Sequence, residues 1–342
     1  MARTVGFFLF LLLSAQLIAQ SPDRDTNFID PYEKMITLRG FISGKYTIFG
    51  LEGSPGVRSL QYRPNTRVNM GIGATYRALT LNLGIGLPNK DDFKGDTRYI
   101  DLQTHIYGKK WRYDLFGQFY RGYYVFPLGY GSADKNTYYQ RPDLNVQEMG
   151  LSAFHIYNNK KFSYRAAFLQ SERQKKSAGS FLLGGSLIYG NIRADSAFVP
   201  SLLKDLYFQD SIRRLQYLEI GPGAGYAYTF VWKEHWFITA SLTLSADMSF
   251  VKESTRGISK NSVNISPNTL FRIGAGYNGD LWSYNFSWVT SRTTIAGQYK
   301  NGGYNTNTGN YRLTISRRFS PGKNLRKLLK PADDILDGNR RR

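Results

Sequence analysis

The sequence predicts an all-β protein, an antiparallel up-and-down transmembrane β-barrel of about 14 strands, within a range of about 12–16. Three observations predict this fold: a leader of the exported type, long stretches in which apolar and polar residues alternate, and a high content of aromatic residues and glycine. The 342 residues include 25 Tyr, 22 Phe and 34 Gly. Membrane barrels place aromatic residues at both lipid–water interfaces, and glycine where strands bend or pack closely.

Residues 1–19 have the composition of a Sec signal peptide. Arg3 supplies the positive charge, an apolar run extends over 5–13, and small residues precede Gln20. The run is shorter than the ~20 residues that a membrane-spanning helix needs, although an uncleaved anchor is the alternative. We therefore expect export and an outer-membrane location. Because the chain has no cysteine, it carries neither a lipoprotein anchor nor a disulfide framework.

Alternation with a period of two predicts the strands. Leu79, Leu81, Leu83 and Ile85 alternate with polar or small residues, and the same pattern extends over 236–248 and 282–288. A soluble β-sandwich alternates as well, but its strands are usually ~5–6 residues long, whereas a membrane strand needs ~9–11. The length of the run at 236–248 favours the membrane.

Two kinds of connection alternate along the chain, as periplasmic turns and outer loops do in barrels. Short turns flanked by aromatic residues are predicted near 77–78, 109–110, 158–159, 233–234 and 279–280, and longer polar loops near 87–97, 126–145, 171–178, 252–264 and 298–309. A further short strand is expected at 191–199, before an outer loop that extends to about 214. The predicted organisation is a signal peptide at 1–19, a short periplasmic segment at 20–34, the barrel at 35–319 and a basic periplasmic tail at 320–342.

Several stretches carry a family resemblance. They are 34–39 (KMITLR), 62–65 (YRPN), 114–124 (DLFGQFYRGYY), 162–168 (FSYRAAF), 174–185 (QKKSAGSFLLGG) and 221–226 (GPGAGY). In these stretches the chain resembles a family known as domain of unknown function 4421, from Bacteroidetes-type bacteria. The resemblance covers nearly all of the mature chain and implies an uncharacterised outer-membrane β-barrel, without assigning catalytic or ligand residues. Phe319 has the place of the final aromatic residue that the outer-membrane assembly machinery reads, although 320–342 follow it.

The charge balance is strongly basic, with 45 Lys and Arg against 25 Asp and Glu, a net charge of +20. After a signal peptide this excess indicates anionic partners of the membrane, such as outer-membrane lipid and lipopolysaccharide, and not nucleic acid. We expect Arg173, Lys175 and Lys176 to lie in an outer loop, where they are candidates for binding lipopolysaccharide phosphates. An ordinary solvated loop is the preferred interpretation.

Ionisable residues on the polar side of the predicted strands should face the lumen, because a charge on the lipid face costs ~2–4 kcal/mol at the midplane. These lumen candidates are Arg39, Asp101, His105, Arg112, Asp114, Arg165, Glu219, Asp247, Arg272 and Arg312. Two interpretations stay open: the arginines line a path for small anionic solutes, or arginine–carboxylate networks brace a filled interior. A barrel of this size lies between filled barrels of about eight strands and open ones of 16–18.

The preferred function is a narrow channel for small anionic solutes. The first alternative is a structural or assembly barrel that binds a periplasmic protein through its tail, where Leu325, Leu328 and Leu329 have helical spacing and Pro331 is expected to stop the helix. A lipid hydrolase is the third, with His105 as its base. None of the three histidines has a serine two residues away, and none has a paired histidine, so we expect no catalytic residue, no metal and no cofactor.

Overall fold

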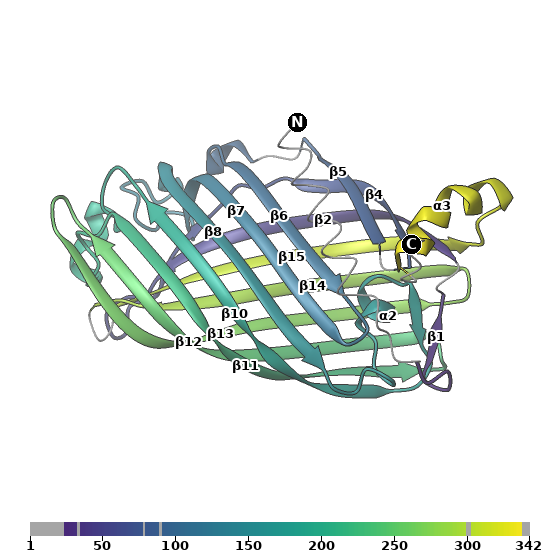
Figure 1. The fold of residues 1–342 in the computed structure, drawn as a ribbon. Helices are drawn as coiled ribbons and strands as arrows, with labels where there is room; N and C mark the ends of the chain where they lie inside the picture. Colours follow the sequence, from purple (N-terminus) through teal and green to yellow (C-terminus); the bar gives the residue numbers. More distant parts are fainter. Residues whose placement is uncertain (1–23, 33–34, 78, 89–90, 299–301, 337–342) are drawn as a thin grey trace.

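The computed structural model describes residues 24–32, 35–77, 79–88, 91–298 and 302–336, so the predicted signal peptide lies outside the described residues. The chain is 64% strand and 7% helix and forms a closed antiparallel β-barrel (Figure 1), which confirms the predicted fold class. Thirteen strands belong to one sheet. A separate pair joins β1 (Ile29–Pro31) to β9 (Glu172–Gln174).

Ten strands close the ring. In chain order they are β2 (Ile36–Leu51), β3 (Leu60–Arg63), β7 (Trp111–Phe126), β8 (Gln140–Ile156), β10 (Ala178–Arg193), β11 (Arg214–Trp232), β12 (Trp236–Ser254), β13 (Ser259–Asn278), β14 (Trp282–Ala296) and β15 (Gly303–Phe319). Pairing of β15 with β2 closes one side. The short strand β3 pairs with both β2 and β7 and closes the other.

The remaining three strands of the sheet fill the wall beside β3. Strand β4 (Val68–Tyr76) pairs with the first half of β2, and β5 (Leu79–Gly86) pairs with β4. Strand β6 (Arg98–Tyr107) pairs with β7. Within the described residues β5 and β6 are not paired with each other, so the wall has a seam between them.

The outer face of the barrel has the polarity that a lipid environment requires. Along β12 the polar residues Thr239, Thr243 and Asp247 are buried, whereas Ile238 and Leu244 are more than half exposed. A soluble sheet has the opposite pattern, with apolar residues inside. Polar residues inside and apolar residues outside are the arrangement of a transmembrane barrel.

The two ends of the barrel differ. At what we call the turn end, short connections join β4 to β5, β6 to β7, β11 to β12 and β13 to β14, and the ends of β2 and β15 meet in the pair Ile36–Phe319. At the opposite end, the loop end, longer connections include 127–139 and 194–213. The ring strands other than β3 have 15–20 residues, more than the ~9–11 that cross a bilayer, so their polar loop-end portions extend into water. For this reason the predicted outer loop at 252–264 is mostly strand.

Two predicted strands have a different structure. Residues 162–170 include α2 (Tyr164–Phe168), a five-residue helix that begins after the N-cap Ser163. Residues 194–199 leave the sheet after β10 and precede the short 3-10 helix η2 (Ser201–Leu206). Both segments fold into the barrel and close it at its ends, as described below.

The tail after β15 forms α3 (Lys323–Leu336). The helix continues through Pro331, so the prediction that this residue stops it is wrong. Pro331 is exposed and costs the helix one backbone hydrogen bond, yet the helix extends five residues beyond it.

In the part of the chain that is described, no helix combines the length and the apolar character needed to cross a lipid bilayer.

Candidate functional site

Buried charged side chains in the lumen separate into two groups. Nine of the ten lumen candidates lie on barrel strands: Arg39, Asp101, His105, Arg112, Asp114, Glu219, Asp247, Arg272 and Arg312. The exception is Arg165, which lies in α2, so the prediction that it sits on a strand is wrong. The arginines on strands lie toward the turn end, whereas most carboxylates lie toward the loop end.

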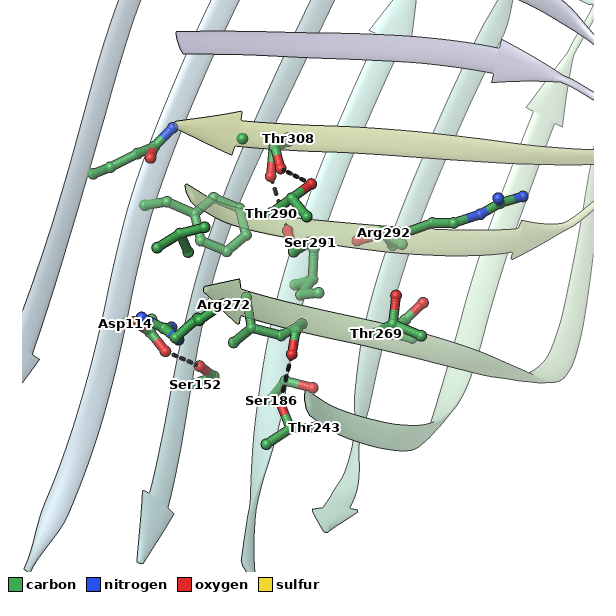
Figure 2. A pocket seen from close by; sticks show the side chains of 18 of the residues that line it. Asp114, Ser152, Ser186, Thr243, Thr269, Arg272, Thr290, Ser291, Arg292 and Thr308 are labelled. Atoms are coloured by element: carbon green, nitrogen blue, oxygen red, sulfur yellow. Dashed lines mark hydrogen bonds and ion pairs between the residues drawn. The ribbon is translucent and has the colours of Figure 1, made fainter. Parts of the chain in front are cut away.

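The centre of the cationic half is Asp114 on β7. Its Oδ1 forms an ion pair with Arg272, at 2.6 Å from Nη2, and lies 2.8 Å from His105 Nδ1. Its Oδ2 accepts from Ser152 Oγ at 3.0 Å (Figure 2) and lies 3.6 Å from Arg112 Nε. One carboxylate therefore faces two guanidiniums, and the positive charge around it is not fully neutralised.

Arg112 is the clearest unsatisfied group of this cluster. Its side chain is fully buried, and among the described residues none of its three guanidinium nitrogens has a hydrogen-bond partner. The guanidinium lies 4.7 Å from the ring centre of Phe154 and 5.7 Å from that of Tyr164. Aromatic faces stabilise the charge but leave its donors open, and a buried donor without an acceptor costs ~1–3 kcal/mol or more. The arrangement is suited to receiving an anion.

Two more arginines extend the cationic half around the barrel. Arg39 on β2 donates to the hydroxyl of Thr75 and to the backbone oxygen of Leu169 at 2.9 Å. The guanidinium of Arg312 on β15 lies 4.5 Å from the ring centre of Phe41. In the described residues Arg312 has no ion-pair partner. We call Arg39, Arg112, Arg272 and Arg312, with Asp114 and His105, the cationic half.

The acidic half lies farther toward the loop end and consists of Glu148, Glu219 and Asp247. Asn268 Nδ2 donates to Glu219 Oε2 at 2.5 Å and to Asp247 Oδ2 at 2.6 Å. Glu148 accepts from Tyr217 at 2.9 Å and from Thr306 at 2.8 Å. In the described residues these carboxylates are held by neutral donors and not by ion pairs. Glu148 was not predicted, because the neighbouring lumen residues of β8, Leu144 and Val146, are apolar and hide the alternation.

A small cavity of about 70 Å³ lies between the two halves. Figure 2 shows its walls, to which Asp114, Ser152, Ser186, Thr243 and Arg272 contribute. Its size matches a few waters or one small polar group such as a carboxylate or phosphate head.

The loop end is closed by residues 194–213, which we call the loop-end plug. Phe198, Leu203 and Tyr207 are buried in the barrel mouth. The ring centres of Phe198 and Phe49 are 5.3 Å apart in an edge-to-face contact. This plug is held by apolar packing and by hydrogen bonds to its backbone oxygens, among them those from Arg141 to Ala197 at 2.8 Å and to Phe198 at 3.3 Å. The strand and outer loop that were predicted here are therefore replaced by a segment folded inward.

The turn end is closed by residues 24–32 together with 157–177, which we call the turn-end plug. Tyr164 of α2 donates to or accepts from Ser241 Oγ at 2.6 Å, and its ring centre lies 5.6 Å from that of Tyr107. Fully buried Glu172 accepts from Arg24 at 2.8 Å and from Arg165 at 3.3 Å. Burial would raise the pKa of Glu172, but the two guanidiniums outweigh it and the pKa is lowered. Ion pairs thus hold this plug.

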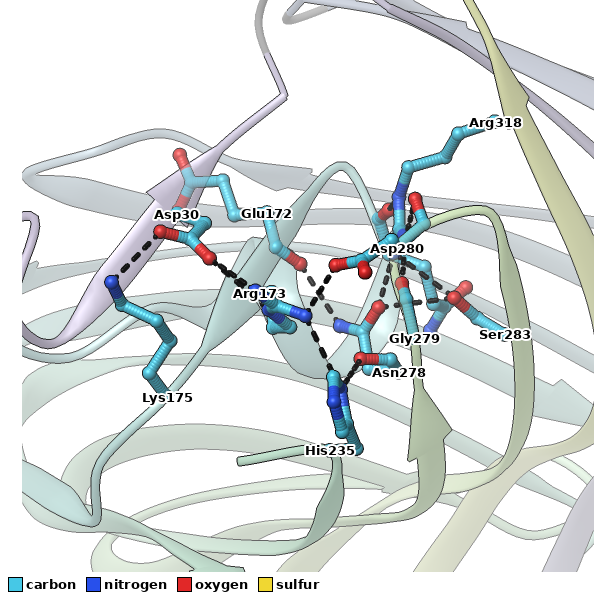
Figure 3. A network of polar contacts seen from close by, with 11 residues as sticks. Asp30, Glu172, Arg173, Lys175, His235, Asn278, Gly279, Asp280, Ser283 and Arg318 are labelled. Atoms are coloured by element: carbon cyan, nitrogen blue, oxygen red, sulfur yellow. Dashed lines mark hydrogen bonds and ion pairs between the residues drawn. The ribbon is translucent and has the colours of Figure 1, made fainter. Parts of the chain in front are cut away.

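The basic residues expected in an outer loop belong to the same plug, at the turn end, so their predicted position is wrong. Figure 3 shows Arg173 between Asp30 and Asp280, with nitrogen–oxygen distances of 2.6 Å to each. Lys175 pairs with Asp30 at 3.0 Å, and Lys176 lies 5.8 Å from the ring centre of Phe28. Burial raises the pKa of Asp30, but the hydrogen bonds from Arg173 and Lys175 prevail and lower it. Segment 171–178 is drawn to the turn end because β9 pairs with β1.

A family model described as "Domain of unknown function (DUF4421)" matches residues 23–319. The chain belongs to this family. The match ends at Phe319, the last residue of β15, and begins one residue before the turn-end plug, so it includes both plugs and the whole sheet. Among curated proteins, none matches this sequence.

Solved structures with a similar fold are barrels of low sequence identity. The outer membrane protease OmpT from Escherichia coli has 10% identity and a TM-score of 0.41, over 84% of this chain and 97% of that chain. The Pseudomonas putida toluene transporter TodX has 9% identity and a TM-score of 0.28, over 86% and 93%. The outer membrane protein OprG from Pseudomonas aeruginosa has 8% identity and a TM-score of 0.21, over 85% and 99%.

Proposed function

We propose that this chain is an outer-membrane barrel that acts as a gated channel for small polar solutes and binds a small anionic group in its cationic half. The observation that supports this most strongly is fully buried Arg112, whose guanidinium nitrogens lack hydrogen-bond partners among the described residues. Bracing alone would pair each arginine with an acceptor. Here Arg112, Arg272 and His105 share the single carboxylate of Asp114.

Two plugs in series give the channel its closed state. Apolar packing and hydrogen bonds hold the loop-end plug, whereas buried ion pairs hold the turn-end plug, so different perturbations should release them. A solute that crosses the barrel along its axis must pass both. Removing one plug should therefore leave the channel closed, and only removal of both plugs should give conductance.

Planar-bilayer recordings on four proteins test the channel. They are the wild type, a variant with 196–211 replaced by a short turn, a variant with 162–175 replaced by a short turn, and the double variant. We expect little conductance from the first three and steady conductance from the double variant. A double variant that folds as a barrel yet never conducts would overturn the channel.

A structural role with a periplasmic partner is the second candidate, and α3 favours it. This helix follows the last strand at the turn end and carries exposed Lys323, Arg326 and Lys327. Removing 323–342 should then leave the barrel intact but abolish co-purification of a partner. The arrangement around His105 gives the hydrolase no support, since His105 and Ser152 both bind Asp114 and, in the described residues, no serine hydroxyl bonds to His105.

A further inference from the structure

The seam between β5 and β6 is a feature that the axial channel does not use. In a bilayer each unsatisfied backbone group costs several kcal/mol, and unpaired strand edges are tolerated at membrane depth only against protein or a water-filled cavity. Strand β5 has eight residues and β6 has ten, and among the described residues neither has a partner on its seam side. The barrel wall therefore opens to the polar lumen along this line, over about 26 Å at ~3.3 Å per residue.

Exposure along β5 is consistent with an opening. Thr80, Asn82 and Gly84 lie on its lumen side and are nevertheless exposed, whereas the lumen-side residues Thr239 and Thr243 of β12 are buried. Because both faces of β5 are accessible, no side chain from β6 covers the lumen side of the seam.

The opening has a frame at both ends, so it is a window and not a split barrel. Toward the loop end, Asn65 Nδ2 donates to the backbone oxygens of Asp91 and Gly95, both at 2.7 Å, and β3 completes the wall. Toward the turn end, Arg165 of the turn-end plug donates to the backbone oxygen of Arg77, in the turn between β4 and β5. We call the seam between these two frames the window.

The two sides of the window have opposite chemistry. On the lumen side, His105 of β6 belongs to the cationic half, where Arg312 has no ion-pair partner among the described residues. On the outer side, an apolar groove of about 1450 Å³ begins at β5, one edge of the window, and extends away from β6 across β4 and β2 to the outer faces of β15, β14 and β13. Ile42, Met70 and Leu83 contribute to its walls. A small positive site inside the opening and a large apolar groove that starts at its β5 edge match a molecule with an anionic head and an alkyl chain.

We propose that the window is a lateral portal that admits such an amphiphile from the bilayer. Its carboxylate or phosphate head binds the cationic half at Arg312, and its alkyl chain lies in the outer groove. The occupant is a component of the lipid phase and not a free anion from solution. This portal rests on the proposed function, because it uses the same cationic half, and it adds the substrate class and the route of entry.

Binding of three probes to the barrel in zwitterionic nanodiscs tests the recognition. Dodecanoate has head and chain, acetate has only the head, and dodecanol has only the chain. Dodecanoate should bind most tightly, and Arg312→Gln should weaken it by about tenfold or more, the effect of losing one charge-assisted hydrogen bond. The control is Arg317→Gln, an exposed arginine on the outer face of the same strand, which should leave binding unchanged. Equal binding of dodecanol and dodecanoate, or equal binding by both variants, would overturn the proposal.

Cross-linking tests the route by which the amphiphile enters. Because the chain has no native cysteine, only the introduced cysteines react. Asn82→Cys with Gln103→Cys, joined by a flexible bismaleimide, ties the two edges of the window together. The control pair is Ala74→Cys with Leu81→Cys, which are register partners on paired strands. Linking across the window should stop exchange of dodecanoate between bilayer and lumen, whereas the control link should not. Unchanged exchange, or a window link that forms between two copies of the chain, would overturn the portal.

The outcomes for the portal and for the proposed function are separate. Phosphate has no alkyl chain and reports on the cationic half alone. If phosphate binding depends on Arg312 but the cross-link over the window leaves dodecanoate exchange unchanged, the portal is wrong and the anion site is supported. If phosphate binding does not depend on Arg312, the proposed function fails as well.

Discussion

Replacing Glu172 with glutamine should open the turn-end plug. Its carboxylate is fully buried and pairs with Arg24 at 2.8 Å and Arg165 at 3.3 Å, so Glu172→Gln leaves two buried cations without their anion. Removing one partner of a buried ion pair costs ~3–5 kcal/mol. If this free-energy cost falls on the closed plug and not on the open one, the ratio of open to closed plug rises by roughly two to three and a half orders of magnitude.

A cysteine inside the lumen measures this opening directly, without requiring the loop-end plug to open. Thr243 lines the central cavity and is buried, and the chain has no other cysteine, so Thr243→Cys is a single reporter. The rate at which a water-soluble maleimide modifies it follows the open population when opening and closing are fast. Glu172→Gln should raise that rate by at least about a hundredfold.

The matched control is Glu234→Gln, an exposed glutamate in the short turn between β11 and β12 at the same end of the barrel. It removes the same charge from the same face and should leave the rate unchanged. Equal modification rates in the two variants would refute the assignment of Glu172 as the residue that holds the plug.

Three further predictions concern the plugs, the cationic half and the sheet. Because the folded pKa of Glu172 is lowered, its contribution to the closed plug is present above its ordinary pKa of ~4.3 and is lost as the pH falls through the folded value. Maleimide modifies the thiolate, whose fraction grows with pH, so the reporter rate is divided by that of a free cysteine at the same pH. This ratio should be flat from about pH 6 to 8 and rise below about pH 4, and a rise of the ratio on the alkaline side would contradict this. Arg112→Met removes a buried charge that makes no hydrogen bond among the described residues, and Asp114 keeps its ion pair with Arg272. The urea midpoint should therefore stay the same or increase while phosphate binding weakens; a large fall in the midpoint would contradict it. A Cβ at Gly190 would lie 2.1 Å from the ring of Tyr217, so Gly190→Val should cost ~1–3 kcal/mol of stability in urea titrations, whereas Gly322→Ala, with open space around it, should cost little.

The alternation of apolar and polar residues predicted the barrel and most of the site. It could do so because it arises from the pleat of long strands, which are the elements that build the barrel wall. Arg272 and Asp247 lie in strands of 20 and 19 residues, whose alternation is unmistakable, and both were placed in the lumen by that pattern alone. The charges of the cationic half could therefore be predicted as a set. Their separation from the acidic half could not, because it depends on the register between strands that lie far apart in the sequence.

The plugs could not be predicted from the same pattern. Residues 162–168 alternate aromatic and small or polar residues as a strand would, and α2 is too short to display a helical period. The local signal for a helix is Ser163, whose hydroxyl accepts from the backbone nitrogen of Ala166 at 3.1 Å. What decides the fold of this segment is burial of Tyr164 and Glu172 against distant residues, which no local pattern contains.

The most direct test of the account is the effect of phosphate on current through the barrel with both plugs shortened. Phosphate added on the turn-end side should block the current saturably, and the block should be at least about tenfold weaker in Arg312→Gln than in Arg317→Gln. Absence of block, or the same block in both variants, would contradict the assignment of the cationic half as an anion site.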